Sequence, residues 1–70
     1  MRRGELLRRI GRRARAENVV WQLKREGRQH EIWQCGTTQV SVPRHREVNT
    51  YTAEAIMKDL ESELGKDWWR

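Results

Sequence analysis

Apolar residues in the first part of the chain repeat at helical spacing. Four of them fall within one stripe about 100° wide when residues 3–16 are drawn as a helix, namely Leu6, Leu7, Ile10 and Ala14. The arginines of the same segment point in other directions, and Asn18 interrupts the pattern. The spacing therefore predicts an amphipathic helix over residues 3–16 with a basic back.

The middle of the chain changes to short segments that are typical of strands. They are residues 19–24, 29–34 and 38–42, separated by turns at 26–28 and 35–37. In the first segment the odd-numbered apolar residues share one side, and in the third, alternation directs Val40 and Val42 inward. Pro43 ends the third strand, because proline has no amide hydrogen to donate to a neighbouring strand.

The last third of the chain returns to helical spacing. Asn49 or Thr50 is suited to cap a second helix, and Gly65 is placed to end it in a left-handed conformation. The apolar stripe between them consists of Ala53, Ile56, Met57, Leu60 and Leu64. The order helix, strand, strand, strand, helix predicts an α+β fold, in which a three-stranded antiparallel sheet carries both helices on one face and leaves the other face open.

The length of the chain limits what it can enclose. A protein of 70 residues buries only about 60% of the surface that its unfolded form exposes, so residues 1–70 are expected to form a single domain. A large cofactor pocket would need more wall than this chain has, which favours a macromolecular partner and no cofactor. The single cysteine, Cys35, offers neither an internal disulfide nor a metal cluster. No apolar run is long enough for a membrane span or a signal peptide, so we expect a cytoplasmic protein without a metal ion.

The charge of the chain favours a polyanionic partner. Lysine and arginine outnumber the acidic residues by 15 to 10, and the excess lies in residues 1–46, which hold 12 basic and 4 acidic residues. Residues 47–70 hold 3 basic and 6 acidic residues. This asymmetry indicates one basic face for phosphates, for which nucleic acid is the first candidate and an anionic membrane the second.

Three segments carry a resemblance to a known family. They read Gly-Arg-Gln-His-Glu-Ile-Trp over residues 27–33, Val-Ser-Val-Pro-Arg-His-Arg-Glu-Val over residues 40–48 and Thr-Ala-Glu-Ala-Ile over residues 52–56. On these motifs, and over residues 4–65, the chain resembles the HicA family of mRNA interferase toxins. Arg28-Gln29 stands where the Gly-Ser-His signature of that family has Gly-Ser.

The resemblance implies both a fold and a function. It implies the helix, three strands, helix fold related to double-stranded RNA-binding domains, and a metal-independent endoribonuclease that cleaves mRNA. It also implies a toxin-antitoxin system, in which a HicB-type antitoxin neutralises the toxin within a hetero-oligomer. The family's catalytic histidine falls on His30.

The chemistry of imidazole suits this role of His30. Near neutral pH it both takes and gives a proton, as cleavage of a phosphodiester by the neighbouring 2′-hydroxyl requires. Without the resemblance, an ordinary exposed histidine of a strand is the better explanation. Orientation matters, because His30 faces outward only if Trp33 points inward, and alternation alone does not decide between the two faces.

Six basic residues near His30 in the predicted fold are candidates for binding RNA, because cations hold a scissile phosphate and stabilise the charge that develops on it. They are Lys24, Arg25, Arg28, Arg44, His45 and Arg46. For any one of them solubility is an equally good explanation, so the cluster carries the argument. A phosphate contact is favoured for His45 over a second proton-transfer role.

The tryptophans and the competing functions leave alternatives open. Trp33 either stacks on a base or, as we favour, belongs to the core. Trp68 and Trp69 either fold back on the domain or dock on a partner.

A non-catalytic RNA-binding module of the same fold is the alternative function, and a DNA-binding regulator ranks last because no helix-turn-helix pair is evident.

Overall fold

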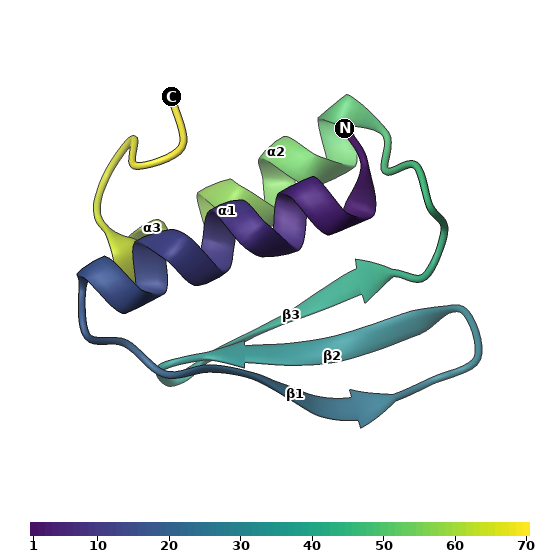
Figure 1. Cartoon of the computed structure of the whole chain (residues 1–70), viewed down its shortest axis with the longest axis horizontal. Coiled ribbons are helices and arrows are strands. Elements are labelled where there is room, and N and C mark those ends of the chain that lie inside the picture. The colour runs from purple at the N-terminus through teal and green to yellow at the C-terminus, as the bar shows by residue number, and fades with distance from the viewer.

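The computed structural model describes all 70 residues, and its elements follow the predicted order. They are α1 (Arg3–Ala16), β1 (Trp21–Glu26), β2 (His30–Cys35), β3 (Thr38–Pro43), α2 (Thr50–Asp59) and a short α3 (Glu61–Leu64). The strands form one antiparallel sheet in the order β1-β2-β3, with α1 and α2 on one face and the other face uncovered (Figure 1). The predicted α+β fold is confirmed. None of the helices has the length and apolar character needed to cross a membrane.

The bounds of α1 agree with the prediction, but β1 begins and ends two residues later than predicted. The backbone of Asn18 is left-handed, with φ of 58°, and the amide of Val19 still donates to the carbonyl of Ala14, 2.8 Å away. Residues 17–20 therefore close the end of α1 instead of starting the strand. A bulge between Leu23 and Arg25 then adds a residue to β1, which extends the strand to Glu26.

The second helix is capped as predicted and then broken once. The side-chain Oδ1 of Asn49 accepts a hydrogen bond from the amide of Tyr51 at 2.7 Å. A turn at Leu60 separates α2 from α3, so the predicted single helix is two, although all five residues of its apolar stripe are buried. Gly65 ends α3 with φ of 104° and ψ of 147°, an extended conformation with positive φ and not the predicted left-handed cap.

The C-terminal tryptophans pack on this domain. Both contact the core of twelve apolar residues that lies between the helices and the sheet. The indole Nε1 of Trp68 donates to the carbonyl of Met57 at 2.9 Å, and that of Trp69 donates to the carboxylate of Glu61 at 2.7 Å. Arg9 of α1 donates to the carbonyl of Trp69. Of the two predicted roles, folding back on the domain is the one that the structure has.

A carboxylate joins α3 to the turn between β2 and β3. Glu63 accepts hydrogen bonds from the hydroxyls of Thr37 and Thr38, at 2.9 and 2.8 Å, and from the amide of Thr37. The hydrogen bond from Thr38 and then that from Thr37 lower the pKa of Glu63. At Gly36, φ is +59° and a side chain would collide with this carboxylate, so the turn requires glycine.

Replacing Glu63 by glutamine is expected to destabilise the protein most at neutral pH. Because the folded state lowers the pKa of Glu63, its stabilising effect is complete above the ordinary pKa of 4.5 and is lost as the pH falls through the lower, folded value. The difference in Tm between the native protein and Glu63→Gln should therefore shrink below about pH 4. Thermal unfolding across the pH range measures it, with Glu54→Gln on the exposed side of α2 as control. A Tm difference that is unchanged in acid would contradict the role of this carboxylate.

Candidate functional site

His30 opens β2 on the uncovered face of the sheet. Cys35, Val40 and Val42 are buried, so their side of the sheet faces the helices. The register pairs Trp33 with Val40 and therefore places Trp33 on that inner side, and alternation turns His30 to the uncovered face. His30 is exposed, and its imidazole makes no hydrogen bond with another residue. Of the two orientations considered from the sequence, this is the one that leaves His30 open to a ligand.

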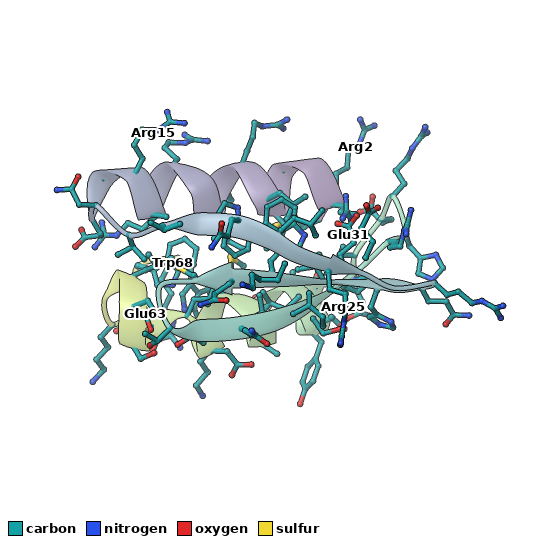
Figure 2. All side chains as sticks on the ribbon, turned by 90° about the horizontal axis from the view of Figure 1, so that it is seen from below. Arg2, Arg15, Arg25, Glu31, Glu63 and Trp68 are labelled. Atoms are coloured by element: carbon teal, nitrogen blue, oxygen red, sulfur yellow. The ribbon has the colours of Figure 1, made fainter.

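An ion pair holds this orientation of β2. Glu31, which follows His30, points to the helix side and accepts hydrogen bonds from the guanidinium of Arg3 and from the indole of Trp33. Figure 2 shows Glu31 between the sheet and the N-terminal end of α1. The side chains of Arg3 and Glu31 are only 22% and 12% exposed. Turning β2 over would leave both charges without a partner, which is costly in a partly buried place.

Arg3 also fixes the strand opposite His30. Its Nε donates to the carbonyl of Pro43 at 2.8 Å, and Pro43 is the residue that pairs with His30 across the sheet. One arginine of α1 therefore holds β2 and β3 at the position of the candidate catalytic residue. Sequence reasoning missed Arg3 and Glu31, and the signal for them was a lone carboxylate on the inner side of an apolar strand.

The turn before His30 is tightly built. The amide of Gly27 donates to the carbonyl of His30 at 2.8 Å, and a Cβ on Gly27 would lie 2.8 Å from the same oxygen, so a side chain there would force the turn to move. The amide of Arg44 donates to the carbonyl of Gln29, and its guanidinium donates to the carbonyl of Gly27 at 2.8 Å. Arg44 thus ties the exit of β3 to the turn that carries His30.

The predicted cations form two groups around this end of the sheet. Arg44 and Arg46 line a shallow hollow together with three arginines at and near the start of α1, which are Arg2, Arg3 and Arg8, and the acidic Glu5 also lines it. Lys24, Arg25 and Arg28 lie on the side of β1: Lys24 at the bulge, Arg25 paired with Ile32, and Arg28 in the turn. His45 is exposed in the bend after β3. Tertiary structure therefore joins the basic N-terminal residues to the exit of β3, which are far apart in sequence.

The charge on the uncovered face is concentrated rather than spread. The uncharged positions of this face are Gln22, Ile32, Gln34, Gln39 and Ser41, of which only Ile32 is apolar. The positive groups lie at the end where β1 turns into β2 and where β3 leaves the sheet. A polyanion that reaches His30 would therefore meet cations on both sides of it.

Cys35 lies outside this arrangement. It is fully buried, and desolvation, followed by the nearby charge of Glu63, raises the pKa of its thiol. A buried thiol of raised pKa is a poor nucleophile. No three histidine, cysteine or acidic side chains come together in a geometry that would hold a metal ion.

Comparison with known proteins adds no relative: no family model, no curated protein and no solved structure matches this chain. The resemblance to the HicA family therefore rests on the motifs over residues 27–33, 40–48 and 52–56. The assignment of His30 and the surrounding cations stays a prediction from those motifs and from the chemistry of the residues.

Proposed function

We propose that this chain is a cytoplasmic endoribonuclease of the HicA type, an mRNA interferase toxin that a HicB-type antitoxin keeps inactive. The observation that carries the proposal is the position of His30. Its imidazole is exposed, engaged by no other residue, and held at the end of the central strand, on the uncovered face of the sheet, where the basic residues also gather.

The reaction that fits this site is transfer of the RNA phosphoryl group to the neighbouring 2′-hydroxyl. The imidazole of His30 takes the proton of that hydroxyl, and the 2′-oxygen attacks the adjacent phosphorus. The bond from phosphorus to the 5′-oxygen then breaks, and the leaving oxygen takes a proton from water or from His45. The products are a 2′,3′-cyclic phosphate and a 5′-hydroxyl, and no metal ion is needed.

The surrounding cations stabilise the charge that develops on the phosphate. Arg44 uses one N–H on the carbonyl of Gly27 and lies 3.9 Å from the carboxylate of Glu26, which holds its guanidinium beside the turn. A guanidinium has five N–H donors, so several remain for phosphate oxygens. Arg46, Arg28 and His45 extend the contact along the backbone of the RNA, and Lys24 and Arg25 do so on the side of β1.

An antitoxin that covers the uncovered sheet face would remove His30 from RNA. The positive end of that face favours an acidic surface on the antitoxin, and complementary charge speeds its capture. A single antitoxin domain laid over the face is enough for inhibition, because every predicted site residue lies at one end of the sheet.

The test is cleavage of an RNA oligonucleotide by the purified full chain in the presence of EDTA. We expect fragments that end in a 2′,3′-cyclic phosphate, and no cleavage at a position where a 2′-deoxynucleotide replaces the ribonucleotide. RNA that is bound but never cut would overturn the proposed nuclease activity and favour a non-catalytic RNA-binding module. Binding of duplex DNA as tightly as RNA would instead favour a DNA-binding regulator.

A further inference from the structure

The arginines of α1 divide into two sets that the sequence does not distinguish. Three make hydrogen bonds within the protein: Arg3 to Glu31 and Pro43, Arg9 to Trp69, and Arg13 to Leu64. Arg8, Arg12 and Arg15 make no hydrogen bond and no ion pair, and all three line one groove between α1 and β1. In Figure 2, Arg15 projects from α1 away from the sheet. This second set is available to an anionic partner.

The floor of this groove is apolar. Trp21 and Trp33 stack with ring centroids 4.7 Å apart, and both rings are half-buried. Gly11 of α1 has no side chain to cover Trp21. A Cβ at this position would lie 3.5 Å from the indole ring, in van der Waals contact with it. Leu7 completes the floor. An aliphatic side chain fits such a surface.

Beside the groove, β1 has a free edge. The sheet order leaves β1 paired only with β2. The carbonyl of Val20 accepts from the amide of Gly36, so Val20 and Gln22 direct their backbone groups to β2, and alternation directs those of Trp21 and Leu23 outward. Val20 and Leu23 are also 64% and 40% exposed, and they are two of the three large apolar residues that are exposed. An unpaired edge of this kind is a template for an added strand.

We propose that this edge and groove bind an extended, acidic segment of a partner protein, which adds a fourth strand beside β1. Its backbone pairs with Trp21 and Leu23, its aliphatic side chains lie on the floor formed by the two indoles, and its carboxylates reach Arg8, Arg12 and Arg15. Strand addition takes affinity from main-chain hydrogen bonds and specificity from the side chains beside them. Charge decides against a second copy of this chain, because pairing two β1 edges would bring two rows of free arginines together.

This surface is separate from His30, although Arg8 also lines the hollow that contains Arg44 and Arg46. The groove lies on the helix side of the sheet at β1, whereas His30 faces the opposite side, so a segment bound there leaves His30 uncovered. The inference stands whether or not the chain cleaves RNA. A His30→Ala protein is expected to bind the segment as the native protein does.

The probe for this surface is a peptide selected from a displayed random-peptide library on the full-length protein, then synthesised. We expect the selected peptides to be rich in acidic and aliphatic residues, and the bound peptide to shift the backbone amide resonances of Trp21 and Leu23. Arg12→Glu should weaken binding by about tenfold, whereas Lys58→Glu, an equal charge change on exposed α2, should alter it less than about twofold.

Three results would overturn the proposal. One is a selection that yields no acidic bias, and another is a bound acidic peptide that leaves the amides of Trp21 and Leu23 unshifted. The third is a single-stranded RNA oligonucleotide that shifts these amides at lower concentration than the selected peptide, which would assign the groove to RNA. A Leu23→Glu variant, which keeps the backbone edge but adds a negative charge that repels an acidic segment, should reduce peptide binding while its Tm stays near that of the native protein.

Discussion

Replacing His30 by alanine is expected to slow RNA cleavage by about 10²- to 10⁴-fold, the usual contribution of a general acid or base. The imidazole makes no hydrogen bond in the protein and lies exposed on the uncovered face, so its loss should leave the fold intact. Initial cleavage rates on one oligonucleotide measure the effect, and unfolding curves check the fold. In cells, expression of the native chain should arrest growth and the variant should not.

Gln34, the last residue but one of β2, provides a matched control. Gln34 is polar and lies on the uncovered face like His30. It pairs with Gln39, away from the basic end of that face. Gln34→Ala is expected to keep most of the cleavage rate. A folded His30→Ala protein that cleaves as fast as the native protein would remove histidine chemistry from this site.

Truncating the chain after Gly65 is expected to destabilise the isolated protein severely. The truncation removes Trp68 and Trp69, which pack on the core and donate to Met57 and Glu61. Deleting large apolar side chains from a packed position costs about 3–5 kcal/mol, and a domain of this size has about 4–10 kcal/mol in total. The truncated protein should therefore be partly or fully unfolded at ordinary temperature.

Urea or thermal unfolding followed by circular dichroism measures this loss. Removing Arg70 alone is the control, because that residue is exposed and pairs only with Asp67 and the ring of Trp69. We expect a Tm change of a few degrees at most for the control, in line with an exposed ion pair. A truncated protein as stable as the native one would show that the packing of the two tryptophans contributes little.

The helices and strands could be predicted because the patterns that specify them, helical spacing, alternation and capping residues, lie within each segment. Helical spacing over residues 3–16 is carried by residues one turn apart, and the prediction of α1 agrees with the structure at both ends. Val40 and Val42 are buried as their alternation predicts, and Asn49 caps α2. The predicted ends of β1 were wrong, and so was the prediction of one continuous helix through Leu60. A bulge and a turn depend on contacts with neighbouring elements, which the pattern of one segment does not show.

The sequence by itself determined the element order, the apolar stripes of both helices and the excess of positive charge, and its resemblance to the HicA family singled out His30 as the candidate base. Only the tertiary structure decided the face on which His30 lies, because the pattern of β2 is apolar on both sides and the Arg3–Glu31 pair joins residues that are distant in the chain. It also decided which arginines of α1 are free, since all of them look alike in a helix with a basic back. Those choices depend on contacts across the fold, and periodicity within one segment holds no information about them.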